Sequence, residues 1–368
     1  MPTSYRVAVI GTGGISRWHA NYFVKLKGAE VVAACDISEE RLLKFSEEYG
    51  VEARYSDHRA MLETEKPDIV CVCTWNAAHP AVTMDAARAG AKGILCEKPM
   101  GADMQGVREM VQVCEDLGTR LAIHHQSRSN AHYNAVRSAV GAGAIGEPRQ
   151  MTWRTAGGML NNCSHGIDLT RYLLGDPTWE LVMGQVGRDT NRYERGVLIE
   201  DFAMGVVRFA GGFELVVEVD IEGDKGDREH DLYGTEGTIH FSASEAALLS
   251  PATDGWETLA EEPQPDPAAE LVAWIEGGPE HRNAGRIALV AQEIMMALYE
   301  SARTNARVAS PLQVTDSPLL RMLADGQLPE PQEDPYDIRS ADALEYALTG
   351  SLTQEGGGDD TPKWIAPP

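Results

Sequence analysis

Three glycines near the start of the chain have the spacing that holds a phosphate group. The apolar run Tyr5-Arg-Val-Ala-Val-Ile10 leads directly into Gly11-Thr-Gly-Gly-Ile-Ser16, and an amphipathic stretch follows. The first glycine permits a tight turn, the second lets the backbone approach a pyrophosphate, and the N–H groups at a helix N-terminus attract the anion. Ser16 replaces the usual third glycine, but it is small enough for close helix–strand packing. The pattern predicts a dinucleotide-binding turn.

An acidic residue ends the second predicted strand. Asp36 lies 25 positions after Gly11, where a carboxylate can hold both hydroxyls of an adenosine ribose. The same carboxylate would repel a 2′-phosphate, so the residues favour NAD over NADP. Arg41, one helical turn further along, could complicate this preference.

A lysine follows another buried strand and could act on a reacting oxygen. Glu97-Lys98-Pro99 comes directly after the apolar run at 93–96. In a doubly wound sheet, ligands bind beyond the carboxyl ends of the strands, so Lys98 is expected beside the nicotinamide. A lysine there can hydrogen-bond the reacting oxygen and stabilise or relay its proton. Pro99 fixes the backbone, and a cis bond is one option. The structural alternative is an exposed lysine that only closes a strand.

The elements needed to position these residues are predicted in the first 126 residues. Apolar strands alternate with helices of 10–15 residues, which indicates a parallel sheet covered on both faces. The strands are expected at 5–10, 30–35, 68–74, 93–96 and 120–125, and the helices at 15–26, 38–49, 78–89 and 103–117. Ser38 and Asp103 are candidate N-caps, and Gly50, Gly90 and Gly118 candidate C-terminal stops.

The pattern changes after residue 126. Longer strands with partial alternation are expected at 147–156, 179–189, 201–211, 213–223 and 228–243, with a hairpin turn at Gly211-Gly212. Helices are expected at 164–174 and 284–304. We therefore predict an α/β Rossmann domain over 1–126 and an α+β domain with an open, mostly antiparallel sheet over 127–310. A Pro-, Gly- and Asp-rich surface arm would follow over 311–368, with a flexible stretch at 355–360.

Composition excludes several classes of protein. The net charge of −24, from 56 acidic and 32 basic residues, disfavours binding to a phosphate backbone, so no nucleic-acid partner is expected. No apolar stretch approaches the roughly 18 residues of a membrane span, and no signal peptide is recognised, so the cytoplasm is the expected location. No Cys-x-x-Cys pair occurs, so the six cysteines are expected to be buried thiols and no metal site is predicted.

Motifs along most of the chain resemble one known family. GTGGIS, TWNAAHP at 74–80 and LCEKPM at 95–100 resemble, in order and spacing, the dinucleotide-binding half of the glucose-fructose oxidoreductase, inositol dehydrogenase and MocA family. GAGAIGEP at 141–148, SHGID at 164–168 followed by LTRYLLG, YGTEG at 233–237 and YESAR at 299–303 resemble its later landmarks. The resemblance covers roughly residues 5 to 312 and leaves out the last 55 or so.

The resemblance implies roles for the matched positions. A first group would bind the dinucleotide, from pyrophosphate to nicotinamide: Gly11, Thr12, Gly13, Gly14, Ile15, Asp36, Thr74, Trp75, Asn76, His79, Glu97, Lys98 and Gln126. Arg128 matches the second of a family pair of arginines that contacts substrate, but the first is Ser127 here.

His165 matches the catalytic histidine of the family. A neutral imidazole can accept a hydroxyl proton as a hydride leaves. The family usually has an acid four residues earlier, where this chain has Asn161, and counting from Gly157-Gly158 points instead to Asn162. Neither position is acidic. Asp168 is expected to cap the helix or to pair structurally. Read alone, His165 would be a capping or packing residue.

The resemblance implies an enzyme that transfers a hydride between NAD and a hydroxyl-bearing carbon of a sugar or cyclitol. The alternatives are a redox-neutral enzyme that cleaves glycosides through a transient oxidation by NAD, and a non-catalytic NAD-binding sensor. Trp153 and Arg154 could contact the substrate, although strand alternation could bury one of them. The apolar face of the open sheet predicts a homo-oligomer, a dimer or a tetramer.

Overall fold

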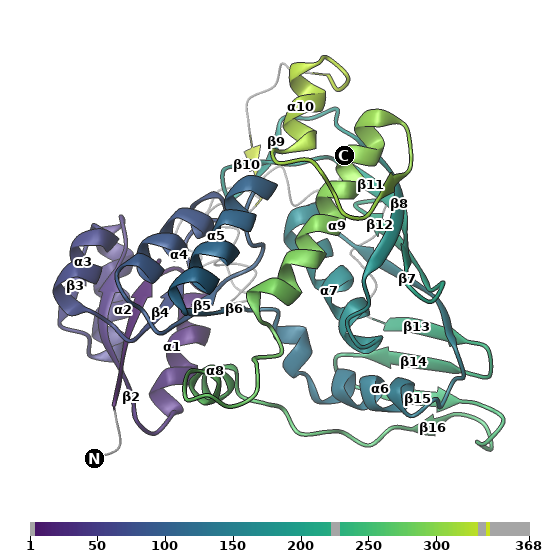
Figure 1. The fold of residues 1–368 in the computed structure, drawn as a ribbon, viewed down its shortest axis with the longest axis horizontal. Helices are drawn as coiled ribbons and strands as arrows, with labels where there is room; N and C mark the ends of the chain where they lie inside the picture. Colours follow the sequence, from purple (N-terminus) through teal and green to yellow (C-terminus); the bar gives the residue numbers. More distant parts are fainter. Residues whose placement is uncertain (1–3, 222–228, 330–335, 339–368) are drawn as a thin grey trace, which may run out of the picture.

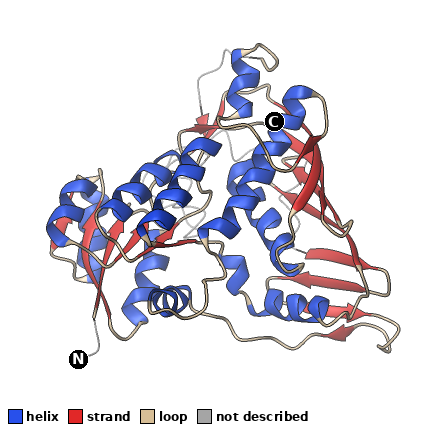
Figure 2. Cartoon of the chain, in the orientation of Figure 1, coloured by secondary structure: helices blue, strands red, loops and turns tan. Residues whose placement is uncertain are grey.

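A computed structural model describes residues 4–221, 229–329 and 336–338. Two units lie side by side (Figure 1), one built on a parallel sheet and the other on a larger, mostly antiparallel sheet. Figure 2 shows that helices surround the first sheet, whereas the helices of the second unit gather on one side of its sheet.

The first unit contains a six-stranded parallel sheet in the order β3-β2-β1-β4-β5-β6. This order places the carboxyl ends of β1 and β4 side by side at the point where the strand order reverses, which is where such sheets bind ligands. The strands are β1 (Tyr5–Ile10), β2 (Ala29–Cys35), β3 (Ala53–Tyr55), β4 (Ile69–Val72), β5 (Gly93–Cys96) and β6 (Arg120–Ile123). The helices between them are α1 (Ser16–Lys25), α2 (Glu39–Tyr49), α3 (His58–Glu65), α4 (His79–Arg88) and α5 (Met104–Leu117).

Both faces of this sheet are covered, because successive strand residues point to opposite sides. In β1, Ala8 and Ile10 join a core with residues of α3, α4 and α5, whereas Val7 and Val9 join a second core with residues of α1 and α2. Helix α8 (Pro267–Ile275) completes this second face and contacts β5 and β6. A segment far along the chain therefore packs on the dinucleotide-type sheet.

The second unit is built on a nine-stranded sheet in the order β16-β15-β14-β13-β7-β12-β11-β8-β17. All of its strand pairs are antiparallel except β7 with β12. The strands are β7 (Pro148–Thr155), β8 (Trp179–Gly187), β11 (Phe202–Phe209), β12 (Glu214–Val219), β13 (Glu229–Gly234), β14 (Thr238–Ser242), β15 (Ala246–Leu249), β16 (Glu257–Thr258) and β17 (Val308–Ala309).

Helices cover the inner face of this sheet and connect it to the first unit. They are α6 (Ala131–Gly141), α7 (Ser164–Leu173), α9 (Gly285–Thr304) and α10 (Pro318–Ala324). Helix α9 contacts both β8 and α5, so it lies between the two units. Three short segments matter for the site: the 3₁₀ turns η1 (Asn76–Ala78) and η2 (Gln126–Ser129), and the π-helix η3 (Gly158–Cys163). A small third sheet joins β10 (Val197–Leu198), β9 (Arg192–Glu194) and β18 (Tyr336–Asp337).

The fold class expected from the sequence is confirmed, and most predicted elements lie within a few residues of their expected positions. Ser38 and Asp103 cap α2 and α5 through their side chains, and Gly50 and Gly118 end these helices in the left-handed conformation. Elements that were not predicted are the helices α3, α6, α8 and α10 and the short strands β3, β9, β10, β15, β16, β17 and β18. The strand expected over 228–243 is two strands, because Gly234–Gly237 forms a turn between β13 and β14. Residues 355–360 lie outside the described residues.

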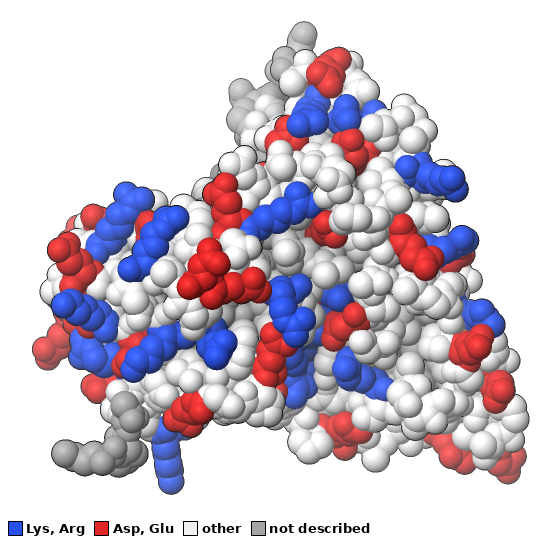
Figure 3. All heavy atoms as spheres, in the orientation of Figure 1, with Lys and Arg blue, Asp and Glu red and all other residues white. Residues whose placement is uncertain are grey.

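The described surface and core agree with the composition. On the face in Figure 3, acidic and basic side chains are interspersed rather than gathered in one basic patch. The six cysteines are all buried and unpaired. Among the described helices, none has the length and apolar character needed to cross a bilayer.

Candidate active site

A cleft of about 550 Å³ opens at the carboxyl ends of the parallel strands. Eight of the predicted cofactor residues line it: Gly11, Gly13, Gly14, Ile15, Asp36, Thr74, Trp75 and Glu97. The structure thus brings together the ends of β1, β2, β4 and β5, as expected for neighbouring parallel strands. Arg41 lines the same end of the cleft as Asp36.

The glycine-rich turn has the geometry that its sequence predicts. Gly11 has φ +87°, and a Cβ there would lie 2.5 Å from the Cys73 carbonyl oxygen, so another residue would strain the turn and collide with the backbone after β4. Ser16 is buried at the start of α1, and its hydroxyl donates to the Gly13 carbonyl at 2.6 Å. The small side chain therefore fits where the usual third glycine would be.

Asp36 is fixed at the edge of this turn. Its Oδ2 accepts hydrogen bonds from the Thr12 backbone N–H at 2.6 Å and the Thr12 hydroxyl at 3.0 Å, and its Oδ1 accepts from the Ser38 N–H at 2.8 Å. The carboxylate therefore connects the glycine-rich turn to the start of α2. Asp36 lines the cleft, so its carboxylate could also accept hydrogen bonds from the hydroxyl groups of a ligand.

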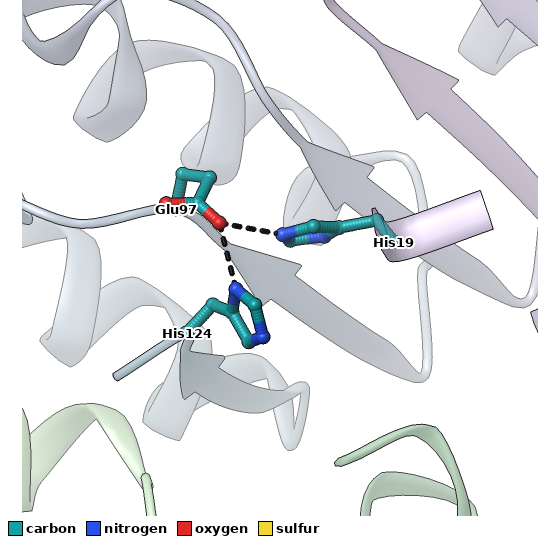
Figure 4. Close-up of side chains that lie close together, drawn as sticks. All are labelled: His19, Glu97 and His124. Atoms are coloured by element: carbon teal, nitrogen blue, oxygen red, sulfur yellow. Dashed lines mark hydrogen bonds and ion pairs between the residues drawn. The ribbon is translucent and has the colours of Figure 1, made fainter. Parts of the chain in front are cut away.

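Glu97 lies at the centre of a buried cluster (Figure 4). Its Oε1 lies 2.8 Å from Nε2 of His19 and 2.7 Å from Nδ1 of His124, and its Oε2 accepts from the Lys98 backbone N–H at 3.2 Å. Burial alone would raise the pKa of Glu97, but His124 and His19 outweigh it and hold the pKa well below its usual value. Glu97 is therefore an ionised group that fixes the backbone beside Lys98.

His19, Glu97 and His124 also carry ligand atoms of the kind that bind metal ions. Ligand atoms of His19, Glu97 and His124 lie within 4.8 Å of one another, and the sequence analysis predicted no such cluster. Hydrogen bonds from the two imidazoles to one carboxylate oxygen already account for their arrangement. The two histidines therefore hold the Glu97 carboxylate in position.

Lys98 reaches from the first unit to the second. Its Nζ donates to the Asn161 backbone oxygen at 3.0 Å and to the Asn161 side-chain oxygen at 2.9 Å, and the lysine is only 8% exposed. The Lys98–Pro99 bond is cis, one of the options the sequence allowed. Asn162 instead donates its amide to the Ala156 carbonyl. Of the two asparagines left open by the sequence, Asn161 is the one in contact with Lys98.

Two carboxylates hold the segment that presents Asn161. The Gly157 and Gly158 N–H groups each donate to Asp220 at 2.8 Å, and the Met159 N–H donates to Glu200 at 2.6 Å. Three consecutive backbone donors at the start of η3 are thus satisfied by side chains from other elements. Short π-helical segments are frequent at functional sites, and this one is anchored at its beginning.

Tyr299 of α9 completes this support. Its hydroxyl donates to the second oxygen of Glu200 at 2.5 Å, and both side chains are buried. Burial raises the pKa of Glu200, and the hydrogen bond from Tyr299 opposes that rise. The π-helix is therefore connected through Glu200 to the helix that lies between the two units.

His165 lies in the first turn of α7, close to Lys98. Burial is the main cause that holds the pKa of His165 well below its usual value, and the Lys98 ammonium and His125 add to it. Its ring faces that of His125, with centroids 6.3 Å apart. The imidazole is therefore neutral at physiological pH, which is the form that a proton acceptor requires.

Two predicted cofactor residues support the loop after β4 instead of lining the cleft. The His79 ring nitrogens lie 2.7 Å from the Pro99 carbonyl oxygen and 2.9 Å from that of Thr74. The buried Asn76 amide donates to Glu194 of β9 at 2.6 Å. Gln126 is exposed at the start of η2 and does not line the cleft.

The residues predicted to contact the substrate lie in different environments. Arg128 is fully buried, and its guanidinium makes bidentate contacts with Asp168 at 2.7 and 2.8 Å and further bonds with Asp176. Asp168 thus pairs structurally, as expected. Because the Arg128 guanidinium is engaged inside the protein, we leave this residue out of the proposed substrate contacts.

Trp153 and Arg154 point to opposite faces of β7. Trp153 stacks on His230 with ring centroids 4.1 Å apart and packs beneath Gly166 of α7, where a Cβ would lie 2.3 Å from the indole. Arg154 lies on the outer face and pairs with Glu218 at 2.5 Å. The alternation therefore buries the tryptophan and places the arginine on the outer face of the sheet, and Arg154 is not among the proposed substrate contacts.

Sequence reasoning missed the residues that support the site. His19, His124, Glu200 and Asp220 carry no local pattern that marks them, because each meets its partner through the tertiary fold. Arg195, which lines the cleft from the second unit, was missed for the same reason. The only local signal for it is the Arg-Gly turn between β9 and β10.

Comparisons with known proteins agree with this geometry. Residues 5–125 match the oxidoreductase family with an NAD-binding Rossmann fold, and residues 150–240 match the GFO/IDH/MocA C-terminal domain. The chain is 28% identical over 361 residues to D-apiose dehydrogenase of Paraburkholderia graminis, covering 88% of this chain and 94% of that protein. It is 28% identical over 250 residues to myo-inositol 2-dehydrogenase of Thermotoga maritima, covering 64% and 74%.

A solved structure has the same fold. The WlbA dehydrogenase of Bordetella pertussis, solved in complex with NADH and UDP-GlcNAcA, superposes with a TM-score of 0.72 at 24% identity and covers 84% of this chain and 100% of that one. Both halves of the family thus match in order along the chain. The chain belongs to the glucose-fructose oxidoreductase, inositol dehydrogenase and MocA family of oxidoreductases.

Proposed function

We propose that this chain is a dehydrogenase that transfers a hydride between NAD and a hydroxyl-bearing carbon of a sugar or cyclitol. The observation that carries the proposal is the contact of the buried Lys98 ammonium with Asn161, since Lys98 comes directly after Glu97, which lines the dinucleotide-type cleft. The charge of Lys98 also acts on His165, whose pKa is lowered mainly by burial. The names of the related apiose and inositol dehydrogenases support the substrate class.

The chemistry divides between two side chains. Bound NAD would accept the hydride released as the carbon–hydrogen bond of the alcohol breaks. Lys98 would donate a hydrogen bond to the hydroxyl oxygen and stabilise the negative charge that develops on it. The neutral His165 would accept the hydroxyl proton, so that the alcohol becomes a carbonyl. In the reverse direction, the His165 imidazolium returns that proton.

We propose NAD as the physiological coenzyme. Asp36 accepts three hydrogen bonds around the turn, which hold its carboxylate in place in the lining of the cleft. A 2′-phosphate would meet this negative charge at close range. Arg41, which lines the same cleft, favours NADP, so both coenzymes belong in the assay.

We also propose that a second copy of the chain covers the outer face of the nine-stranded sheet. Met183, Phe202 and Met204 are exposed there at 58%, 37% and 46%, and large apolar patches are rarely left in water. Light scattering during gel filtration would give the mass. A monomeric mass of about 40 kDa, unchanged at high concentration, would contradict this proposal.

The direct test is an absorbance screen for reduced coenzyme, with a panel of sugars and cyclitols and with NAD and NADP in parallel. We expect NADH formation with at least one polyol and slower turnover with NADP. A product without net NADH would favour the redox-neutral glycoside-cleaving alternative. Tight NAD binding with no turnover on any substrate would favour the sensor.

A further inference from the structure

Arg195 enters the cofactor cleft from the second unit. The other residues that line this cleft lie between Ile10 and Glu97, on the parallel-sheet unit. Arg195 lies between β9 and β10, and its side chain is only 14% exposed. The second unit therefore contributes a cation to a site that is otherwise built by the first.

The turn that carries Arg195 is held in an uncommon conformation. Arg195 has φ +48° and Gly196 has φ +72°, and a non-glycine residue in this region of backbone conformation is strained. The Asp337 carboxylate accepts both backbone N–H groups, from Arg195 at 2.8 Å and from Gly196 at 2.6 Å. Strain that is held by such contacts is typical of functional positions.

The tip of the turn also packs against the first unit. A Cβ at Gly196 would lie 3.3 Å from the Trp75 ring, so the backbone lies directly over this cleft residue. Beside it, Glu194 is fully buried and bonds to Asn76 of the loop after β4. The position of Arg195 relative to the glycine-rich turn is therefore fixed from both sides.

The contacts of the Arg195 guanidinium with Glu194 and Asn76 are long, so the group can still bind an anionic ligand. Its Nε lies 3.3 Å from Glu194, and an Nη lies 3.5 Å from the Asn76 oxygen. Both contacts are long for charge-assisted bonds, which are usually near 2.7–2.9 Å. A guanidinium has five N–H donors in a planar fork that matches two phosphate oxygens.

We propose that Arg195 binds the pyrophosphate of the dinucleotide, opposite the glycine-rich turn. This inference rests on the proposed function, since it assumes a dinucleotide in the cleft. Two carboxylates, Asp36 and Glu97, line the same cleft, so a cation there would offset the repulsion that a dianionic pyrophosphate meets and add to the attraction of the backbone N–H groups of α1. Arg195 supplies that charge, whereas Arg41 lies at the adenosine end near Asp36.

The test is calorimetric binding of three probes to the full chain: NAD, ADP-ribose and adenosine. For Arg195→Gln we expect the dissociation constants of NAD and ADP-ribose to rise about 10-fold or more, the scale of a hydrogen bond to a charged group. Adenosine lacks the pyrophosphate, so its affinity should stay within about 2-fold of the wild type. Arg195→Lys keeps the charge without the fork and should give a smaller loss.

Arg208→Gln is the matched control, since this exposed arginine pairs with Glu214 on the outer sheet and should leave all three affinities unchanged. Unchanged NAD affinity in Arg195→Gln, a loss confined to NAD, or an equal loss for adenosine would each overturn the assignment. If the wild-type chain binds neither NAD nor NADP, the proposed function itself fails. Equal melting temperatures for the variants would show that folding is not the cause of a loss.

Discussion

At the level of single residues, the candidate site differs at position 161 from the pattern that the family resemblance implies. Lys98 donates to both oxygens of Asn161, where the family resemblance leads one to expect a carboxylate. An amide oxygen accepts the hydrogen bond but brings no negative charge. Burial and, after it, the positive charge of Lys98 lower the pKa of His165 and outweigh the opposite effect of the Glu97 and Asp168 carboxylates.

Removal of Lys98 should affect turnover much more than cofactor binding. Lys98→Ala is expected to lower kcat by about 100-fold or more, the scale of one acid–base group, while the dissociation constant of NAD changes little. Steady-state kinetics and a binding titration measure the two effects. Lys92→Ala is the control, because that lysine pairs with Asp68 on the surface. Near-full turnover in Lys98→Ala would exclude the catalytic role.

A carboxylate restored at Asn161 should move the pH profile of oxidation. Oxidation requires neutral His165, so activity is lost as the pH falls through its lowered pKa. Asn161→Asp adds a negative charge that favours the imidazolium and raises this pKa. The acidic limb of kcat/KM should therefore move to higher pH, and His165→Ala should sharply reduce oxidation.

Asn162→Asp is the matched control for this experiment. Its amide contacts the Ala156 carbonyl instead of Lys98, so its pH profile should shift less. If only Asn162→Asp shifts the profile, the missing family acid belongs at position 162. If His165→Ala stays active, proton transfer proceeds through Lys98 and water.

At the level of elements, the π-helix η3 decides where Asn161 lies. The N–H groups of Gly157, Gly158 and Met159 at its start donate to Asp220, which follows β12, and to Glu200, which lies between β10 and β11. Asp220 itself has φ +52°, which an aspartate tolerates better than most residues. The sheet of the second unit thus positions a residue that contacts the lysine of the first.

Glu200→Gln should change turnover more than binding. The amide keeps one acceptor oxygen, so either the Met159 N–H or the Tyr299 hydroxyl loses its acceptor. Small displacements of catalytic groups can cost up to about 100-fold in rate, and we expect kcat to fall about 10-fold with the NAD affinity unchanged. Tyr299→Phe leaves the acceptor for Met159 in place and should cost less. Equal losses in kcat and NAD affinity would indicate general unfolding of the region instead.

At the level of the whole molecule, a buried ion-pair cluster lies at the junction of the two units. Arg128 of η2 pairs with Asp168 of α7 and with Asp176, and Arg282, just before α9, donates to the Arg128 carbonyl at 3.0 Å. Burial would raise the pKa of Asp168, but Arg128 and His125 outweigh it and hold the pKa well below its usual value. The cluster connects the segment leaving the first unit to the helices of the second.

Asp168→Asn should strongly destabilise the protein. Breaking a buried ion pair by removing one partner costs about 3–5 kcal/mol, measurable as a lower urea midpoint. Asp168 has a depressed folded-state pKa, so its contribution is present above the unfolded value near 4 and is lost as the pH falls below it. The gap between wild type and variant should therefore persist from pH 8 to 5 and shrink only in stronger acid.

Arg154→Gln serves as the control for this measurement, because it removes an exposed pair with Glu218 that should be worth about 1 kcal/mol or less. A loss in Asp168→Asn no larger than in this control would show that the cluster contributes little to stability.

The sequence by itself determined the features that depend on neighbours along the chain. Strand–turn–helix order predicted the glycine-rich turn, Asp36 and Lys98, because periodicity, capping and tight turns are local properties. Residues after neighbouring parallel strands must meet at one edge of the sheet, so the cleft could be predicted as well. The hairpin at Gly211-Gly212 was predicted for the same local reason and is present between β11 and β12.

Only the tertiary structure decided which distant residues meet. Asn161 and Asn162 are adjacent in sequence, and their different partners follow from a π-helix anchored by strands about 40 to 60 positions further along. The substrate hypotheses for Arg128 and Arg154 depended on the direction in which each side chain points. In the structure, Arg128 is buried against Asp168, and Arg154 pairs with Glu218 at the surface. Long-range packing and desolvation select these partners, and neither leaves a period or a motif in the local sequence.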